Sequence, residues 1–284
     1  MSLPMSFAEA MLRDGLTPPV SIKPGEIARC SGLGKGPSNK AGWCWLSPDA
    51  KAGAYGCWAA AFSTTWHDER QPFTPGERAL FLRRLAEAKL QAERERTERW
   101  KQASARARDI WRKAQPANPE HEYLKAKQVA PYCARQSGPR LVLPIVGWDG
   151  QLSSLQFIGP DGEKRMLTGG RKQGCFIPIH AQRGAARIVI CEGFATAATL
   201  ADAEPASLVL AALDAGNLQP VAVRARKHHP SAAIVIAADA DAVGTSKARA
   251  AAVACAGLMA VPEFPSGVEG SDFNDLAAWQ RRQA

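Results

Sequence analysis

Short apolar runs alternate with turn-forming residues in the first quarter of the chain. Residues 1–74 are rich in Gly, Pro and Trp, and runs such as AGWCWLSPD and GAYGCWAAAFSTTW are bounded by Gly, Pro, Ser and Asp. Runs of this kind predict short β-strands joined by turns. We therefore expect a β-rich N-terminal module over residues 1–74.

The pattern becomes helical at Pro75. The stretch up to Gln115 is dense in helix-forming residues and has no internal proline. An apolar stripe in RALFLRRLAEAKL fades in QAERERTERWKQ, which carries mixed charge. The sequence predicts one long helix or two abutting helices, partly solvated, that form a helical linker over residues 75–117.

A third pattern covers residues 118–186. HEYLKAKQVA is typical of a short helix, and the following RLVLPIVGWDGQLSSLQFIGPDGEKRMLTGG alternates like a β-meander. The Asp-Gly pairs in WDGQ and PDGE indicate tight turns between the strands. We expect a small α+β subdomain here.

Strands and helices alternate regularly over residues 187–284. The predicted strands are RIVICE, SLVLAAL, AAIVIAAD and LMAVPEF, and each is followed by a segment with helical character. Near-continuous apolar strands that alternate with helices predict a parallel α/β sheet covered on both faces. The expected fold class is α/β with a Rossmann-like parallel sheet, preceded by the α+β subdomain, the linker and the β-rich module.

Composition places the chain among ordinary globular proteins. It has 284 residues, of which 46% are hydrophobic and 22% charged. Apolar runs stay well below the roughly 20 residues that span a membrane, and MSLPMSFAEAMLRDGL does not resemble a secretory signal. We expect a cytoplasmic protein without a membrane partner. The net charge of +9 is concentrated in residues 75–185, which favours a polyanionic partner such as nucleic acid.

The seven cysteines lack any CxxC pair, so neither a disulfide framework nor a zinc ribbon is indicated. Reduced, mostly buried thiols are expected, and no zinc. One alternative is a zinc ion held by Cys30, Cys44, Cys57 and His67. The segment GLGKGPSNK lacks the spacing of a phosphate-binding loop, and we interpret it as a flexible turn.

Carboxylates follow the predicted strands at three places: Glu192 after RIVIC, Asp239 and Asp241 after AAIVIAA, and Asp272 with Asp275 in GSDFNDL. Functional groups of open α/β sheets lie beyond the carboxyl ends of the strands. On an extended strand residues i and i+2 face the same way, so the paired aspartates would project together and repel unless a cation lies between them. Oxygen ligands favour Mg²⁺, Mn²⁺ or Ca²⁺. As alternatives, Asp272 caps its helix and Glu192 forms a salt bridge.

This constellation resembles the Toprim domain, the metal-binding α/β fold of bacterial-type primases, topoisomerases and some nucleases. VICEGFATAATL is similar to its glutamate motif, and VIAADADAVGTSKARAAA is similar to its Asp-x-Asp motif, including Gly244. The β-meander before it resembles the subdomain that precedes Toprim in bacterial replicative primases, where a basic motif would correspond to Lys164 and Arg165. The likeness covers about residues 118–284 and implies a Toprim catalytic domain over residues 187–284.

The resemblance implies a primase-like nucleotidyltransferase that synthesises short primers on single-stranded DNA from nucleoside triphosphates. Asp239, Asp241, Asp272 and, more weakly, Asp275 would hold Mg²⁺ or Mn²⁺, and Glu192 would act as general acid/base or further ligand. Lys164, Arg165, Arg171 and Lys172 would contact the triphosphate or template. The linker arginines Arg94, Arg96, Arg106 and Arg108 would follow the template strand.

Three other activities remain to be weighed. Toprim metals can also activate water, which would make the chain a nuclease, and the Trp-rich module could instead serve a non-catalytic single-stranded-DNA-binding accessory protein. Tryptophans Trp43, Trp45, Trp58 and Trp66 are the candidates for stacking, although burial in the core is their commoner fate. A topoisomerase is disfavoured because the chain is too short for a DNA gate. A replicative helicase or single-strand-binding protein is a further possible partner.

Overall fold

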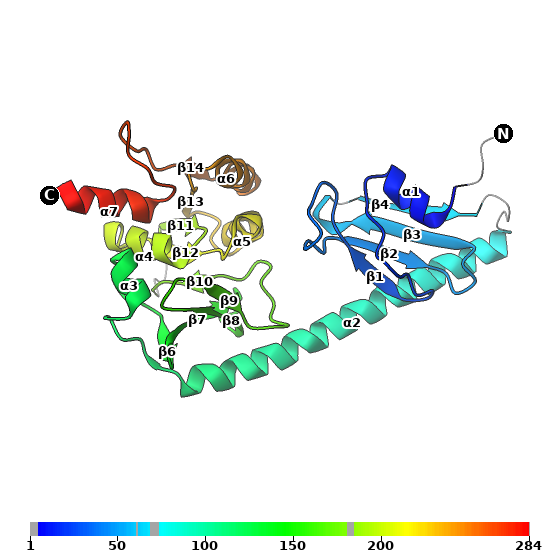
Figure 1. Cartoon of the computed structure of the whole chain (residues 1–284), viewed down its shortest axis with the longest axis horizontal. Coiled ribbons are helices and arrows are strands. Elements are labelled where there is room, and N and C mark those ends of the chain that lie inside the picture. The colour runs from blue at the N-terminus through cyan, green and yellow to red at the C-terminus, as the bar shows by residue number, and fades with distance from the viewer. Residues whose placement is uncertain (1–4, 61, 69–73, 181–184, 284) are drawn as a thin grey trace. The chain divides into compact units, whose positions relative to one another are not determined.

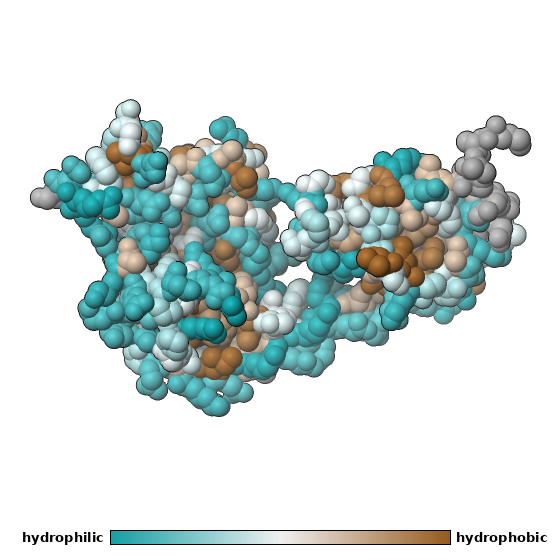
Figure 2. Space-filling view, in the orientation of Figure 1, coloured by the Kyte–Doolittle hydropathy of each residue, from teal (hydrophilic) through white to brown (hydrophobic). Residues whose placement is uncertain are grey.

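The computed structural model describes residues 5–60, 62–68, 74–180 and 185–283, and the chain forms two compact units, Met1–Glu98 and Arg99–Ala284 (Figure 1). Helix α2 (Pro75–Lys113) contributes its first part to one unit and its last part to the other. The predicted helix over residues 75–115 is thus confirmed as a single element. Figure 2 shows many hydrophilic residues along its course, as the charge pattern predicts, although Leu80, Leu82 and Leu90 of this helix are about half exposed.

The first unit is built on a four-stranded antiparallel sheet in the order β1-β2-β3-β4. Its elements are β1 (Ile27–Cys30), β2 (Gly42–Leu46), β3 (Ala52–Cys57), the 3-10 turn η1 (Trp58–Ala60) and β4 (Phe62–His67). Because side chains alternate across a sheet, each strand serves two cores. Cys44 and Tyr55 face helix α1 (Phe7–Arg13) on one side, while Trp45 packs against Phe81 of α2 on the other.

Helix α1 was not predicted from the sequence. It begins at a capping box in which Ser6 and Glu9 bind each other's backbone N–H groups, and it buries Phe7 and Met11 against the sheet. A helix of seven residues is too short to be stable alone, so its burial on the sheet supplies most of its stability. The sequence signal that could have found it is the S-x-x-E spacing.

The second unit contains two sheets. The antiparallel sheet consists of β5 (Gln115–Pro116), β6 (Arg135–Ser137), β7 (Arg140–Val146), β8 (Leu152–Ile158) and β9 (Lys164–Met166), with helix α3 (Glu122–Lys127) in its connections. The predicted turns join β7 to β8 and β8 to β9. In both, the Asp side chain (Asp149 or Asp161) accepts a backbone N–H two residues on, and the following glycine has positive φ.

The other sheet has the order β10-β12-β11-β13-β14, with only β10 antiparallel to its neighbour. Its elements are β10 (Ile177–Pro178), β11 (Arg187–Cys191), α4 (Phe194–Ala203), β12 (Leu208–Ala211), α5 (Ala215–His228), β13 (Ala233–Ala237), α6 (Ala242–Ala254), β14 (Leu258–Ala260) and α7 (Phe273–Gln283). This parallel α/β arrangement confirms the predicted fold class.

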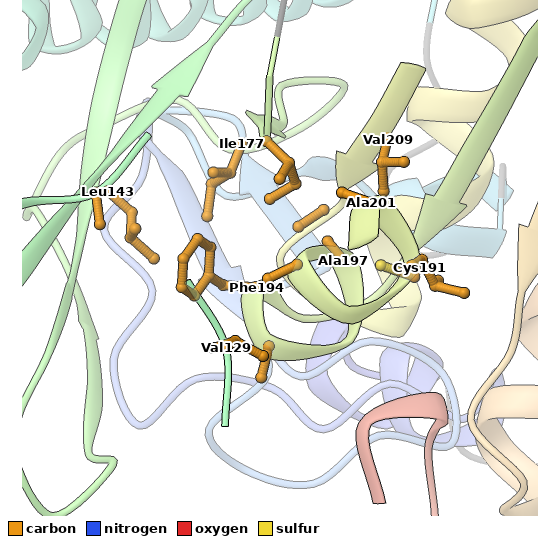
Figure 3. Packing of buried hydrophobic residues seen from close by; sticks show 14 of the residues in the cluster. Val129, Leu143, Ile177, Cys191, Phe194, Ala197, Ala201 and Val209 are labelled. Atoms are coloured by element: carbon orange, nitrogen blue, oxygen red, sulfur yellow. The ribbon is translucent and has the colours of Figure 1, made fainter. Parts of the chain in front are cut away.

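Both faces of the parallel sheet are buried. Ile188 and Ile190 face helices α5 and α6, whereas the alternating Val189 and Cys191 face α4 and the antiparallel sheet. Figure 3 shows Phe194 of α4 on the side toward Leu143 and Val129, with Ala197 nearer the sheet strands. One continuous core therefore joins α4, the antiparallel sheet and the parallel sheet, and it fixes the loops that follow β11 and β13.

The alternative zinc site is not assembled. Cys30, Cys44 and Cys57 are buried in the core between the sheet and α1, and burial raises the pKa of the Cys44 thiol to about 12. His67 ends β4 opposite Ala52, on the α2 side of the sheet. Side chains on opposite faces cannot share one ion, so these four residues do not form a metal site in the structure.

No helix in the described part of the chain is long and apolar enough to cross a membrane. The division at residues 74, 117 and 186 into a β-rich module, linker, α+β subdomain and Toprim domain remains a prediction. Part of the first of these, residues 1–4, 61 and 69–73, lies outside the described residues.

Candidate active site

The candidate site lies where the two central strands of the parallel sheet end. Strands β11 and β13 run side by side in parallel, with Cys191 paired to Ala237. Glu192 follows the first strand directly, and Asp239 follows the second after one more residue. The register therefore brings these two acids to one edge of the sheet, as the sequence predicts.

Asp239 is half-buried and incompletely satisfied. Within the described part of the chain, its Oδ1 atom is buried and has no hydrogen-bond partner. Burial and the negative charges of Asp272 and Asp241 raise the pKa of Asp239 to about 6, against a smaller opposing effect of Lys164. A buried carboxylate oxygen without a donor is costly, and a cation would remove that cost.

Glu192 lies in the same electrostatic field. Burial, followed by the charges of Asp239 and Asp214, raises the pKa of Glu192 to about 7, while Lys164 acts in the opposite sense. Carboxyl groups tuned to this range suit proton transfer at neutral pH. The salt-bridge alternative is not supported, because no ion pair of Glu192 occurs among the described residues.

Asp241 has a different environment from Asp239. Strand β13 ends at Ala237, so the two aspartates do not sit on an extended strand, and the predicted i, i+2 geometry is wrong. Asp241 is the exposed N-cap of α6, and its Oδ1 accepts the Gly244 N–H at 2.6 Å. Its charge still raises the pKa of Asp239, so the pair is close despite the changed geometry.

Gly244 allows the helix to approach Asp239. A Cβ atom at position 244 would lie 2.9 Å from the Asp239 carbonyl oxygen and 3.1 Å from its Cβ. Both distances are shorter than ordinary van der Waals contacts. The glycine of the Asp-x-Asp motif is therefore explained by close packing.

The start of α7 adds two more carboxylates, Asp272 just before the helix and Asp275 in its first turn. The Ala240 N–H donates to the Ser271 carbonyl at 2.7 Å, which ties this loop to the one after β13. Asp272 caps α7: its Oδ1 accepts the Asp275 N–H at 2.9 Å, and its Oδ2 accepts the Thr196 hydroxyl at 3.1 Å. The capping alternative for Asp272 is correct, and the same residue also lies within the acidic cluster.

Asp275 is held by partners of its own. Its Oδ2 accepts hydrogen bonds from the Ser271 N–H at 3.0 Å and hydroxyl at 3.2 Å, and its Oδ1 is 3.6 Å from the Lys127 Nζ. Burial alone would raise the pKa of Asp275, but these hydrogen bonds and the Lys127 charge outweigh it and lower the pKa. A carboxylate so engaged has the least capacity of the set to bind a metal ion.

The predicted basic residues separate into two groups. Lys164 reaches the cluster: its Nζ would lie 3.7 Å from a Cβ atom at Gly193, beside Glu192. Arg165, its neighbour on β9, forms an exposed ion pair with Glu163 at 2.7 Å. Consecutive strand residues face opposite sides, so Lys164 and Arg165 cannot both point to the acids.

Arg171 and Lys172 lie on the loop before β10. Arg171 donates through Nε to the Cys175 Sγ at 3.2 Å, with its guanidinium 5.9 Å from the Trp100 ring. Lys172 forms an ion pair with Asp214, whose charge also raises the pKa of Glu192. This pair connects the basic loop electrostatically to the edge of the site.

Sequence reasoning missed several residues around the cluster. Asn274 is almost fully buried and donates to the Lys127 carbonyl at 2.7 Å and to the Thr199 hydroxyl at 2.9 Å, which joins α7 to α3 and α4. Tyr123 is buried, and burial and the Asp272 charge raise its pKa to about 12. Tyr123, Lys127 and Lys164 line a cavity of about 220 Å³ with Ala126, Pro160, Asp161 and Gly162. The spacing of DFNDL was the available signal for Asn274.

The side chains at this site meet some, but not all, of the requirements for binding a divalent cation. The orphaned Asp239 oxygen and the surrounding acids provide hard oxygen ligands. Among the described residues, however, no three His, Cys, Asp or Glu side chains already converge on one ion. Mg²⁺ is commonly held by one or two carboxylates together with water and substrate phosphates, and this arrangement suits that mode.

Comparison with known proteins identifies the C-terminal region. Residues 187–282 match the Toprim domain family. Two curated proteins called DNA primase TraC, both from Escherichia coli, are 36% identical over 220 residues and 35% identical over 157 residues, which are 71% and 50% of this chain. The chain spans only 20% and 11% of the length of these relatives.

Solved structures show weaker likenesses. The primase fragment of the bacteriophage T7 primase-helicase has a TM-score of 0.45 and 14% identity, with 90% of this chain and 97% of that chain covered. The DnaG primase catalytic domain bound to ssDNA has a TM-score of 0.34 and 14% identity, with 60% and 63% covered. The family match and the sequence relatives, with the parallel sheet described above, show that the chain is a Toprim-domain, primase-like protein.

Proposed function

We propose that the chain is a DNA primase-type nucleotidyltransferase that makes short primers on single-stranded DNA. The observation that carries the proposal is the buried, unpartnered Oδ1 of Asp239 beside Glu192 and Lys164. Like charges gathered in a half-buried site are unfavourable unless a cation and a phosphorylated substrate complete it. The sequence similarity to DNA primases directs this chemistry toward nucleotide transfer.

Asp239, Asp241 and Asp272 would hold Mg²⁺ or Mn²⁺, and Asp275 would contribute least because Ser271 and Lys127 already engage it. The ion would neutralise charge on the triphosphate during an in-line displacement. Asp241 and Asp272 also cap α6 and α7, so the ligands are fixed by the starts of two helices. This double use keeps the acids in place before substrate binds.

Glu192 would accept the proton of the primer 3′-hydroxyl. The 3′-oxygen forms a bond to the α-phosphorus, the bond between that phosphorus and the bridging oxygen breaks, and pyrophosphate leaves. A pKa of about 7 keeps a large fraction of Glu192 ionised at neutral pH while leaving it basic enough to take a proton. Lys164, whose charge acts on both Glu192 and Asp239, would contact the triphosphate.

The cavity between α3 and the β8–β9 turn is suited to part of the nucleotide. Its volume of about 220 Å³ is lined by the Tyr123 ring and by Lys127 and Lys164. The basic groups Arg165, Arg171 and Lys172 would act more remotely, on the template, since they already have partners on the protein. Interaction with a replicative helicase or single-strand-binding protein remains a prediction.

The test is primer synthesis on single-stranded DNA with labelled ribo- and deoxynucleotides, in Mg²⁺ and in Mn²⁺. Asp239→Asn is the variant, and Asp109→Asn is the matched control, because Asp109 is an exposed acid on α2. Short products that disappear in Asp239→Asn and persist in Asp109→Asn are expected. Degradation of the template without nucleotides would identify a nuclease, and binding without either reaction would identify an accessory protein.

A further inference from the structure

The N-terminal unit exposes one of the tryptophans that the sequence singles out. Trp43 and Trp45 are buried in the sheet, with 3% and 1% of their surfaces exposed, whereas Trp58 on η1 is 48% exposed. This indole contributes little to the core, and its exposed part is accessible to a partner outside the unit. Nucleobases are one kind of partner that such a ring can bind, because bases stack on aromatic side chains.

Cations flank this tryptophan on the protein surface. The Arg29 guanidinium lies 4.2 Å from the centre of the Trp58 ring, and the Trp58 and Trp43 rings are 5.5 Å apart and inclined by 35°. Lys89 of α2 lies 4.7 Å from the Trp43 ring on the same face of the sheet. The four side chains thus form a row of two neighbouring rings with one cation at each end, and each cation lies over a ring, which is favourable.

Arg29 is oriented before any ligand arrives. Its Nε donates to the Lys40 carbonyl at 2.8 Å, and its Nη2 donates to the same oxygen. A guanidinium fixed by a carbonyl at one edge and a ring at one face loses little conformational entropy on binding. Its planar face and positive charge suit a base or a phosphate.

The glycine-rich turn GLGKGPSNK supplies further positive charge. Lys35 and Lys40 are exposed on this turn. The backbone N–H of Trp58 donates to the Ala41 carbonyl at 3.0 Å, which holds the turn against η1. Between Glu26 and Asp49 the sequence contains three cations and no carboxylate. This lysine-containing turn, which lacks the spacing of a phosphate-binding loop, therefore lies beside the exposed Trp58 ring.

The neighbouring edge strand is polar and open. Arg29, Trp43, Gly56 and Ser63 pair across the four strands and so lie on one face of the sheet. Ser63 of the edge strand β4 is exposed, as is Thr65 two residues on. Hydroxyl groups next to an aromatic and cationic surface add hydrogen-bonding capacity for a sugar–phosphate backbone.

We infer that this surface, the Trp58 face (Arg29, Lys35, Lys40, Trp58 and Lys89), binds single-stranded DNA. A base packs against the exposed part of the Trp58 ring and against the Arg29 guanidinium that covers it, and the three lysines contact phosphates. The contact is independent of nucleotide transfer, because every residue in it belongs to the unit Met1–Glu98. Since all bases have a π-face and the lysines contact only the backbone, binding is salt-dependent and shows little sequence preference.

The test measures the dissociation constant of the full chain for a labelled oligothymidylate by fluorescence anisotropy, over a series of salt concentrations. Trp58→Ala is expected to weaken binding about tenfold, from the usual contribution of one stacked base. Lys40→Glu is expected to weaken it severalfold and to reduce the salt slope by about 1. The matched control is Lys23→Glu, an exposed lysine outside the face, and a duplex of the same length tests the need for unpaired bases.

The two variants guard against misinterpretation. Lys40 is exposed on a turn, so Lys40→Glu tests the face even if Trp58→Ala disturbs folding, which circular dichroism checks. If both variants bind as Lys23→Glu does, or if the duplex binds as tightly as the single strand, the inference is wrong. Asp239→Asn should keep the wild-type dissociation constant for oligothymidylate while losing primer synthesis. A failure of the proposed catalytic site can therefore be distinguished from a failure of the proposed DNA-binding surface.

Discussion

The acids of the candidate site fall into two regions, the strand ends and the helix starts, and these regions are held in opposite ways. At the strand ends, Glu192 and Asp239 are half-buried and repelled by their neighbours, which raises their pKa values to about 7 and 6. At the helix starts, Asp241, Asp272 and Asp275 accept backbone N–H groups.

The difference separates two requirements of a charged site. A carboxylate at a helix start is stabilised by the N–H groups that it caps, so it contributes both structure and charge. A carboxylate at a strand end gains no such bond and keeps lone pairs available for a cation or a proton. We therefore expect mutations at strand ends to lower activity without lowering stability, and mutations at helix starts to lower both activity and stability.

The largest effect is expected for Asp239→Asn. If Asp239 holds the metal as proposed, this change should reduce primer synthesis by at least 100-fold, because its unpartnered oxygen would be the most available ligand of the set. The same change should raise the free energy of unfolding in metal-free buffer by about 1 kcal/mol, after allowing for solvent screening, since it removes an uncompensated charge. Synthesis assays and thermal unfolding measure the two effects, with Asp109→Asn as control. A loss of both activity and stability would contradict the proposed contrast.

The pH dependence of Glu192→Gln comes next. If Glu192 is the base, wild-type synthesis should rise with pH through about 7, and Glu192→Gln should lose that step and fall about 10- to 100-fold in rate. Rates measured between pH 5.5 and 8.5 with saturating metal, with the exposed Glu120→Gln as control, decide this. An unchanged pH profile in Glu192→Gln would assign the proton transfer elsewhere.

Stability should follow the same groups with a defined sign. The folded-state pKa values of Glu192 and Asp239 lie above their ordinary values of 4.5 and 3.8, so the folded protein binds these protons more tightly. Their contribution to stability is full below about pH 4 and is lost as pH rises through 6 to 7. Denaturant unfolding in metal-free buffer should show this decline, and Asp239→Asn should reduce it. If the free energy of unfolding of the wild type rises between pH 4 and 7, and Asp239→Asn removes that rise, the raised pKa values assigned to these two groups are wrong.

The fold was largely predictable from the sequence because its signals are local. Alternating apolar strands and helices identified the parallel sheet, and the Asp-Gly pairs identified the turns. The site was predictable as a set of acids but not in its geometry. Asp241 was expected on a strand with Asp239, whereas it caps α6. Whether a carboxylate points into the cluster or caps a helix depends on the residue at which the strand ends. Sequence patterns locate that residue only to within two or three positions, which is too imprecise to distinguish the two cases.

The contacts from distant parts of the chain were not predictable. Thr196 and Asp272 are hydrogen-bonded although 76 residues separate them, and Asn274 donates to the Lys127 carbonyl across 147 residues. Helix α1 was missed because its stability comes from burial on the sheet. Tertiary packing decides such features, and no single-sequence pattern encodes it.

A moderate effect is expected for Gly244→Ala. The new methyl group would lie 2.9 Å from the Asp239 carbonyl, so either α6 or the Asp239 loop must move. Synthesis should fall about tenfold because a displacement of a few tenths of an ångström misplaces a ligand. Ser246→Ala, an exposed position on the same helix, is the control, and equal activities of the two variants would show that the loop adapts.

Asp241 distinguishes the two duties of a helix-start acid. Asp241→Ser keeps an oxygen that can accept the Gly244 N–H but removes the charge, whereas Asp241→Ala removes both. The alanine variant should lose about 1 kcal/mol of stability and the serine variant only a few tenths, while both lose primer synthesis to the same extent. Retained synthesis in Asp241→Ser would show that the residue acts as a cap and not as a ligand.

The smallest effect is expected for Thr196, which acts on the site through Asp272. Its hydroxyl donates to the Asp272 Oδ2 at 3.1 Å, and the side chain is almost fully buried on α4. Thr196→Val keeps the shape but leaves that oxygen without its donor, so we expect synthesis to fall severalfold and the metal concentration for half-maximal activity to change. Thr196→Ser should restore both because it restores the donor. If the valine variant is as active as the wild type, the hydrogen bond to Asp272 does not support the site. If the serine variant is as impaired as the valine variant, the hydroxyl alone does not support the site, and packing of the threonine methyl group on α4 is needed as well.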